Sequence, residues 1–109
     1  MDKTLMQLTQ KVLKFRDERN WAKFHTGKDL AMCLSIESSE VQELFLWKNE
    51  NEINLEKLAD EMGDVFYSLL LLADKYSINL EEALINKIEK NKIKYPIDEF
   101  RDSNRKYNE

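Results

Sequence analysis

Apolar residues along this chain recur every three or four positions over long stretches, which is the period of helices with one buried face. Thr4, Asn54 and Asn79 stand where such stretches begin, and their side chains are typical helix N-caps. We therefore expect four helices, over residues 4–20, 29–48, 55–76 and 80–94. The short connections between them favour an all-α fold, an antiparallel four-helix bundle.

Pro96 marks the end of the helical part, because proline cannot continue a helix. The residues after it, 97–109, are strongly polar, and we expect them to be extended or loosely packed. The 109 residues suit a single domain. The sequence thus predicts one helical domain over residues 1–96 and a polar C-terminal tail over residues 97–109.

The third predicted helix carries apolar residues almost all the way round, because residues 69–72 are four consecutive leucines. A helix of this kind is buried on all sides. Four helices from one small chain would not easily cover it, so we expect a homodimer or a homotetramer with this helix near the interface. The alternative is a monomer in which it is the central helix.

Two pairs of carboxylates, each spaced three residues apart, fall within the second and third predicted helices. They are Glu37 with Glu40, and Glu61 with Asp64. At about 100° per residue, Glu37 and Glu61 lie at the centres of apolar stripes, and each partner lies about 60° to one side. Each helix therefore points two carboxylates toward the side that should be buried.

Burial of an ionised carboxylate is costly unless the group is paired, protonated or bound to a metal. Four carboxylates that face one another would repel, so they cannot satisfy one another. A divalent cation with oxygen ligands, Mg²⁺ in particular, would resolve the conflict. The alternative is that the acids lie on the helix rims and form salt bridges with Lys or Arg, but two pairs centred in apolar stripes favour a metal.

Composition excludes several other functions. The formal net charge of −4 argues against a broad basic surface for a nucleic-acid polymer. The single cysteine, Cys33, cannot form an internal disulfide and favours a reducing, cytoplasmic location. No apolar run is long enough to span a membrane, and the N-terminus lacks the apolar core of a signal peptide, so we expect no membrane association.

The ordered motifs of the chain resemble the MazG-like all-α nucleoside triphosphate pyrophosphohydrolases, and they are most similar to the branch of the dCTP pyrophosphatase type. The family pattern places Glu-x-x-Glu on one helix and Glu-x-x-Asp on the next, and both acidic pairs fit it. Four further segments are similar to that branch, at residues 15–25, 44–48, 87–96 and 105–107. The resemblance covers residues 12–107, nearly the full chain.

The resemblance implies hydrolysis of a (deoxy)nucleoside triphosphate, dCTP or a related dNTP, to the monophosphate and pyrophosphate. It implies that the four acids ligate Mg²⁺ and that Glu40 and Glu61 are catalytic. Glu40 is the candidate general base for the attacking water. The implied substrate-binding residues are Trp21, His25 and Trp47 around the base, and Lys87, Asn91 and Lys94 at the phosphates or sugar. Taken singly, the tryptophans could be core anchors and the lysines an ordinary solvated face.

One position departs from the family pattern. The branch commonly has a tyrosine four residues after the motif aspartate, in contact with the nucleoside. Here that position is Ser68, and Tyr67 precedes it. A shift of one residue rotates a helical side chain by about 100°, so Tyr67 is not expected to replace that ring directly. A broader or shifted base specificity follows as an expectation.

Three other functions remain to be weighed. A related all-α pyrophosphohydrolase could act on dUTP or phosphoribosyl-ATP, but the aromatic segment 21–25 favours the dCTP pyrophosphatase type. A non-catalytic helical module that binds a nucleotide or a partner would be free to lose an acid, whereas all four are present. A di-iron protein would need Glu-x-x-His pairs, and His25 lies outside both motifs. The resemblance suggests removal of damaged or surplus dNTPs as the cellular role.

Overall fold

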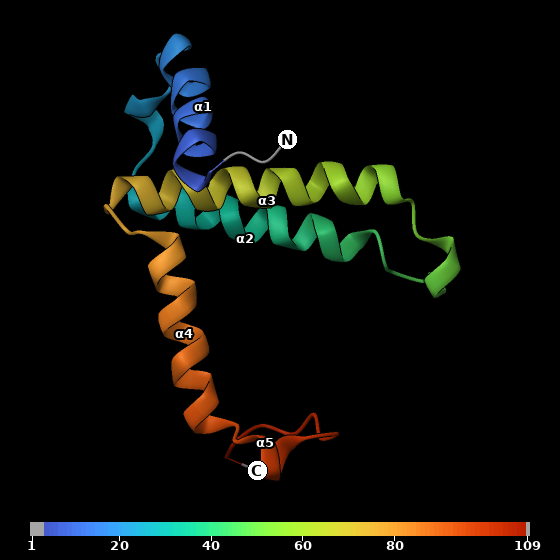
Figure 1. Cartoon of the computed structure of the whole chain (residues 1–109). Coiled ribbons are helices and arrows are strands. Elements are labelled where there is room, and N and C mark those ends of the chain that lie inside the picture. Colours follow the sequence, from blue (N-terminus) through green and yellow to red (C-terminus); the bar gives the residue numbers. More distant parts are fainter. Residues whose placement is uncertain (1–3, 109) are drawn as a thin grey trace. The chain divides into compact units, whose positions relative to one another are not determined.

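The described residues, 4–108 of the computed structural model, form helices and turns without a strand, so the all-α prediction is confirmed (Figure 1). The α-helices are α1 (Leu5–Glu18), α2 (Gly27–Glu43), α3 (Leu55–Lys75), α4 (Leu80–Lys94) and α5 (Ile97–Phe100). Two 3₁₀ turns lie between them, η1 (Ala22–Phe24) and η2 (Glu50–Glu52). One compact unit ends at Ser77 and a second begins at Ile78. The four-helix bundle stays a prediction, since three of its helices lie in the first unit and the fourth in the second.

The expected helix starts are set by local side-chain caps. Thr4 accepts the backbone amide of Gln7 at 3.2 Å, and the Gln7 side chain accepts the Thr4 amide at 3.0 Å, which completes a capping box. Asn54 and Asn79 each accept the amide three residues on at 3.1 Å, as expected. Thr26 does the same for α2, which therefore begins two residues earlier than the expected start at residue 29.

The end of the second helix was predicted wrongly. The sequence favoured a helix to residue 48, but α2 ends at Glu43 and its last turn tightens. The amides of Leu44 and Phe45 bond to carbonyls only three residues back, at 3.2 and 3.0 Å. Trp47 then takes a left-handed backbone, with φ of 62°, which a right-handed helix cannot contain. The apolar segment 44–47 thus forms the start of the α2–α3 connection.

The first unit is built around a hairpin in which α3 runs antiparallel to α2, and α1 also contacts α3 (Figure 1). Leu30 of α2 and Leu70, Leu71 and Ala73 of α3 are the buried apolar side chains of the described chain. The two outer leucines of the run 69–72 are half-buried. The leucine run therefore lies in the core of this unit, as its pattern indicated. None of the described helices is both long and apolar enough to cross a membrane.

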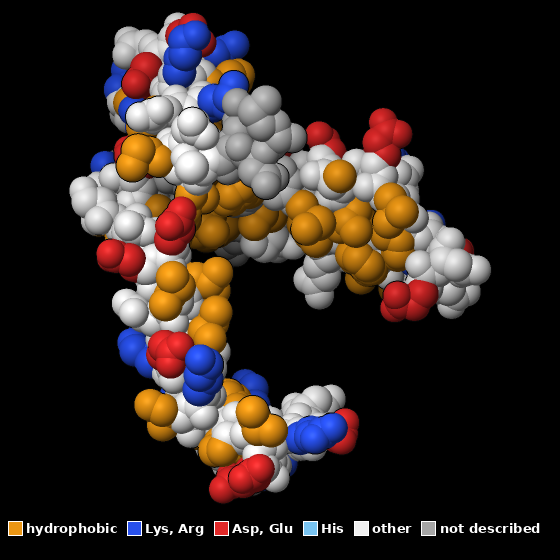
Figure 2. Space-filling view, in the orientation of Figure 1, with side chains coloured by type: hydrophobic (Ala, Val, Ile, Leu, Met, Phe, Trp, Pro, Cys, Tyr) orange, Lys and Arg blue, Asp and Glu red, His pale blue; other side chains and the backbone are white. Residues whose placement is uncertain are grey.

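Apolar side chains also gather on the outside of this hairpin (Figure 2). Exposed apolar side chains on the two helices include Met32 and Ile36 on α2 and Met62 and Phe66 on α3, all between 41% and 55% exposed. Each pair is spaced four residues apart, so each forms a stripe along one side of its helix. Stripes of this kind are surfaces that an oligomer could cover.

The second unit contains α4, α5 and the segment after them. The ring of Tyr95 lies edge-to-face with Phe100 at 4.9 Å and with Tyr107 at 5.9 Å between centroids. Lys94 places its ammonium 4.9 Å from the centroid of the Tyr107 ring. The segment after α4, which the sequence predicts to be extended or loosely packed, thus has aromatic residues that contact the end of α4. Residues 1–3 and 109, at the ends of the predicted domain and tail, lie outside the described range.

We predict that Leu70→Ala lowers the free energy of unfolding by about 2–5 kcal/mol, because it removes a buried side chain from the α2–α3 core and leaves a cavity. Leu55→Ala on the same helix is the matched control, since Leu55 is 73% exposed, and it should change stability by less than about 0.5 kcal/mol. Urea unfolding followed by circular dichroism measures both. Equal losses from the two variants would contradict this assignment of the core.

Candidate metal centre

Four carboxylates meet between α2 and α3. Glu37 and Glu40 come from α2, and Glu61 and Asp64 come from α3. One oxygen from each lies within 4.8 Å of the corresponding oxygens of the others. The antiparallel hairpin brings the two i, i+3 pairs face to face, because each pair occupies one side of its helix. The convergence expected from the sequence is therefore present.

The cluster is half-buried and open at one edge. Glu37, Glu40 and Glu61 are partly covered, whereas Asp64 is exposed. A ligand can therefore reach the cluster at Asp64, its exposed carboxylate.

Two of the four carboxylates carry buried oxygens without a hydrogen-bond partner in the described chain: Oε2 of Glu37 and Oε2 of Glu61. Burial raises the pKa of Glu37 above its ordinary value, and contact with Glu40 and the charges of Glu40 and Asp64 raise it further. The pKa of Glu61 is raised mainly by its hydrogen bond with Glu40, and then by burial and neighbouring acidic charges. The cluster therefore holds negative charge that the chain itself does not compensate.

No lysine or arginine of residues 4–77 forms an ion pair with any of the four carboxylates. Within residues 4–108, the ion pairs join Lys14 to Glu18, Arg16 to Asp17, and Lys92 to Glu89. The rim-and-salt-bridge interpretation weighed from the sequence is therefore not supported. Four oxygen donors, two of them buried and unpartnered, suit a hard divalent cation. Such a cation prefers oxygen ligands and needs no nitrogen or sulfur ligand.

A cavity of about 450 Å³ lies beside the cluster and shares Asp64 with it. Its other lining residues are Lys11, Val12, Phe15, Trp21 and Tyr67. The Phe15 ring lies edge-to-face with both other rings, at 5.8 Å from Trp21 and 6.1 Å from Tyr67 between centroids. Three aromatic side chains next to a carboxylate cluster suit a ligand with two parts. A flat, largely apolar group would lie in the cavity, and an attached anionic group would bind a cation held by the carboxylates.

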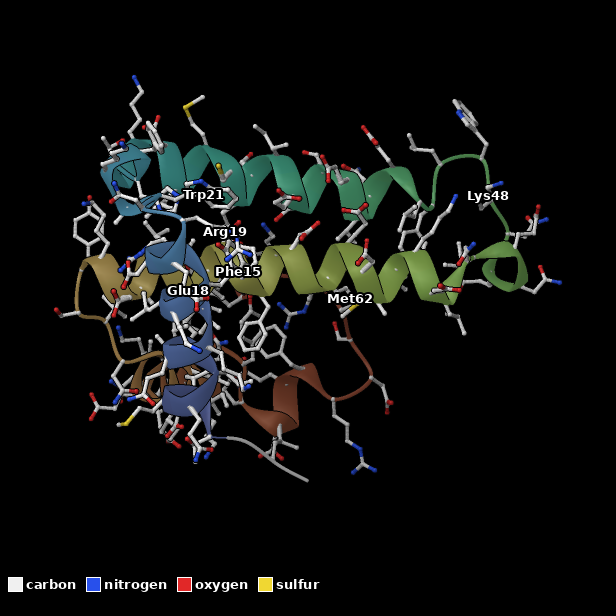
Figure 3. All side chains as sticks on the ribbon, turned by 90° about the horizontal axis from the view of Figure 1, so that it is seen from above. Phe15, Glu18, Arg19, Trp21, Lys48 and Met62 are labelled. Carbon is white, nitrogen blue, oxygen red and sulfur yellow. The ribbon has the colours of Figure 1, made fainter. Side chains whose placement is uncertain are left out.

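Arg19 holds the outer part of this aromatic wall in place. Its guanidinium carbon lies 3.7 Å from the centroid of the Phe15 ring, and it donates a hydrogen bond of 2.8 Å to the Phe15 carbonyl. Figure 3 shows Phe15, Arg19 and Trp21 gathered where α1 ends over the hairpin. The cavity wall therefore comes from an ordered helix end and not from a free loop.

The other expected site residues are placed differently. His25 follows η1 and is half-buried, with an Nδ1 atom that has no partner among the described residues, but it does not line the cavity. Trp47 is 97% exposed, and its neighbour Lys48 lies at the opposite end of the hairpin from Trp21 (Figure 3). The structure therefore does not bring Trp47 to the cavity within one chain.

The three expected contacts on α4, Lys87, Asn91 and Lys94, belong to the second unit. Asn91 is half-buried, and the Lys94 ammonium lies over the Tyr107 ring. Their roles toward a substrate stay predictions.

Tyr67 is a cavity residue that the sequence reasoning set aside. Ser68 is 5% exposed and buried in the core, whereas Tyr67 lines the cavity with Trp21 and Asp64. The rotation by one residue thus takes position 68 away from the cavity and brings Tyr67 to it. The available signal was the spacing from Asp64 to Tyr67, which is three residues and places both on one side of α3.

Comparison with known proteins places this architecture among nucleotide enzymes. The model of the MazG-like family matches residues 32–109. dCTP pyrophosphatase 1 of Homo sapiens is 32% identical over 97% of this chain and 67% of its own length, and that of Mus musculus is 32% identical over 95% and 66%. The chain thus spans about two thirds of the length of these relatives. A pyrophosphatase structure from Archaeoglobus fulgidus DSM 4304 is 38% identical, with a TM-score of 0.82, and the match covers 88% of this chain and 95% of that chain.

We predict that the metal-free protein becomes less stable as pH rises above the ordinary pKa of a glutamate side chain. Between the ordinary and the raised pKa of Glu37 and Glu61, the folded chain keeps protons that the unfolded chain has released, so the free energy of unfolding falls with rising pH. Glu37→Gln should reduce this fall, raise the metal-free Tm at pH 7.5, and weaken the further rise in Tm caused by Mg²⁺.

Thermal unfolding in EDTA and in Mg²⁺ at several pH values measures these effects. Glu43→Gln, a change at the end of α2 outside the cluster, is the control and should leave the Mg²⁺ response unchanged. A Glu37→Gln protein with the pH profile and Mg²⁺ response of the wild type would show that the four acids neither repel one another nor bind the ion.

Proposed function

The chain belongs to the MazG-like family and is a nucleotide pyrophosphohydrolase, and on that premise we propose that it converts a (deoxy)nucleoside triphosphate to the monophosphate and pyrophosphate with Mg²⁺. The observation that carries this proposal is the convergence of four carboxylates beside an aromatic cavity. dCTP or a related dNTP is the favoured substrate, since the relatives in Homo sapiens and Mus musculus are named dCTP pyrophosphatase 1.

Glu37, Glu40, Glu61 and Asp64 would hold the Mg²⁺ ion. When bound, the ion would neutralise charge on the triphosphate and polarise the phosphate that is attacked. The exposed position of Asp64 would leave room for the α-phosphate beside the ion that these carboxylates hold. A water molecule held at the same place would lie near that phosphate, which would favour its attack.

Glu40 is the proposed general base. It contacts both Glu37 and Glu61, so it lies at the centre of the acidic group. In the proposed step, a water oxygen bonds to the α-phosphorus, the bond from that phosphorus to the bridging oxygen breaks, and pyrophosphate leaves. Glu40 accepts the proton released by the water. Glu61, whose carboxylate lies next to that of Glu40, would keep the base oriented and so share the catalytic role.

The nucleoside would occupy the cavity beside Asp64, with its base against the ring of Trp21. We propose that His25 and Trp47 complete base recognition and that three α4 side chains meet the phosphates or sugar: Lys87, Asn91 and Lys94. The positive charge of the two lysines suits phosphate oxygens. A role in removing damaged or surplus dNTPs would follow from this activity.

We also propose that the protein is a homodimer or homotetramer. The exposed stripes of Met32 and Ile36 on α2 and of Met62 and Phe66 on α3 support this, because apolar faces of this kind are usually covered. Trp47, almost fully exposed, is a further candidate for burial by a second copy.

The decisive experiment is a hydrolysis panel over all NTPs and dNTPs, with Mg²⁺ and with EDTA, in which the products are identified. We expect release of monophosphate and pyrophosphate from at least one dNTP, with a loss of at least about 100-fold in Glu61→Gln, because that change removes both a metal ligand and the partner of the base. Glu56→Gln, five residues earlier on α3 and outside the cluster, should keep wild-type activity.

If every triphosphate survives while Mg²⁺ still binds, the catalytic proposal is wrong. The chain would then be a non-catalytic module that binds a nucleotide or a partner. Release of orthophosphate in place of pyrophosphate would instead show that water does not attack the α-phosphorus.

We predict that sedimentation velocity gives the mass of a dimer or tetramer. Phe66→Lys should shift the protein toward the monomer, because it places a charge within the exposed stripe of α3. Met6→Lys is the control, since Met6 is 71% exposed on α1, outside the proposed surface. A monomeric wild-type protein at micromolar concentration would exclude the proposed assembly.

A further inference from the structure

Three aromatic side chains of the second unit form a cluster to which the proposed function assigns no role. Tyr95 follows the last residue of α4, and its ring lies edge-to-face with Phe100 of α5 and with Tyr107, at 4.9 and 5.9 Å between centroids. Tyr107 lies in the segment after α5. This aromatic cluster therefore joins the last segment of the chain to the end of the helix that carries Lys94.

A turn after α5 lies between Phe100 and Tyr107. The amide of Ser103 donates a hydrogen bond of 3.0 Å to the carbonyl of Phe100. Within that turn Asp102 has a φ of 64°, a left-handed conformation that aspartate adopts more readily than most residues. The contact between Tyr107 and Tyr95 is therefore supported by a hydrogen-bonded turn.

Lys94 contacts this aromatic cluster. Its ammonium nitrogen lies 4.9 Å from the centroid of the Tyr107 ring, within the range of a cation–π interaction. Lys94 is half-buried, as is Asn91, which lies three residues earlier and hence on the same side of α4. The other lysines of this helix are exposed: Lys87, Lys90 and Lys92. The two half-buried candidates for substrate contact therefore share one side of α4.

The Tyr107 ring can orient the ammonium of Lys94 without cancelling its charge. Among the described residues, no carboxylate forms an ion pair with Lys94, whereas Lys92 is paired with Glu89 at 2.9 Å. A carboxylate would neutralise the ammonium and occupy its N–H donors. An aromatic ring has no net charge, so the positive charge of Lys94 stays available to an anionic ligand.

We propose that Tyr107 is a positioning residue, whose ring holds the ammonium of Lys94 where it binds a phosphate group of the substrate. The inference rests on the proposed function, since that function assigns Lys94 to the phosphates or sugar. A free lysine side chain is flexible, and holding it in advance reduces the entropy that is lost when the ligand binds. Tyr107 therefore acts through Lys94 and does not itself contact the substrate.

A purely structural role of Tyr107 has different consequences. Lys94 lies in the last turn of α4, where a positive charge stabilises the helix end, and Tyr107 packs on Tyr95. Loss of packing alone would lower Tm whether or not Lys94 is present. Loss of positioning would raise KM, and only while Lys94 is present. A double-mutant cycle therefore separates the two roles.

The test measures kcat and KM of the full chain, with Mg²⁺, for the dNTP that it cleaves fastest. Tyr107→Leu removes the aromatic face and keeps an apolar side chain, so KM should rise about two- to fivefold while kcat stays unchanged. Tyr107→Phe should keep the wild-type KM, because its ring remains. Lys94→Met should raise KM about tenfold or more, and adding Tyr107→Leu to it should cause no further rise.

Lys92→Met is the matched control, since Lys92 lies on the same helix, is exposed and is already paired with Glu89. It should leave KM unchanged. Circular dichroism and Tm show whether each variant folds. If Tyr107→Leu does not fold, Tyr107→Met takes its place, because the flexible methionine side chain fills irregular space.

Two kinds of result would overturn the proposal. Active enzyme in which Tyr107→Leu or Tyr107→Met leaves KM unchanged, or raises it equally with and without Lys94, overturns the inference alone. A Lys94→Met enzyme with the wild-type KM does the same, because there would be no phosphate contact to position. A wild type that cleaves no triphosphate overturns the proposed function, and the inference with it.

Discussion

The mutual repulsion of four carboxylates is the constraint on which the rest of the first unit depends. Their oxygens lie within 4.8 Å of one another, and two of those that are buried have no partner in the described chain. Such an arrangement persists only when other interactions hold the two helices together. The core formed by Leu30 on α2 and Leu70 and Leu71 on α3 supplies that support. The packing of these apolar side chains thus offsets the repulsion between the carboxylates. The unsatisfied carboxylate oxygens, in turn, allow the site to attract a cation.

The same helix, α3, joins the acidic cluster to the aromatic cavity. Asp64 belongs to both, and Tyr67 follows one turn later on the same side. Because one helix carries both residues, their separation is set by helical geometry. The end of α1 then closes the cavity with Phe15 and Trp21, and Arg19 holds Phe15 in place. The proposed metal centre and the cavity therefore adjoin each other in the first unit.

The single chain leaves much apolar surface open, which bears on how complete its site is. Few side chains are buried, while large apolar residues remain exposed on both helices of the hairpin and at Trp47. A small domain buries a smaller fraction of its surface than a large one, so association is a common source of added stability. An assembly that covers the far end of the hairpin would place Trp47 in an interface. The proposed contact of Trp47 with the substrate would then depend on a second copy of the chain.

The sequence by itself determined that four long helices form, where three of them start, and which helix faces carry the acidic pairs. Thr4, Asn54 and Asn79 cap their helices as expected, and the spacing of Glu37, Glu40, Glu61 and Asp64 placed each pair on the inner side of its helix. These features depend on hydrogen bonds and periodicity within a few residues, which a sequence displays directly.

The tertiary structure alone decided where α2 ends, which side chains form the cavity, and how far Trp47 lies from Trp21. The turn at 44–47 depends on the path to α3, and the cavity depends on α1 packing over the hairpin, so neither follows from local pattern. Tyr67 shows the difference most clearly. Its spacing from Asp64 was visible in the sequence, but only the position of Phe15, more than fifty residues away along the chain, made that side of α3 a cavity wall.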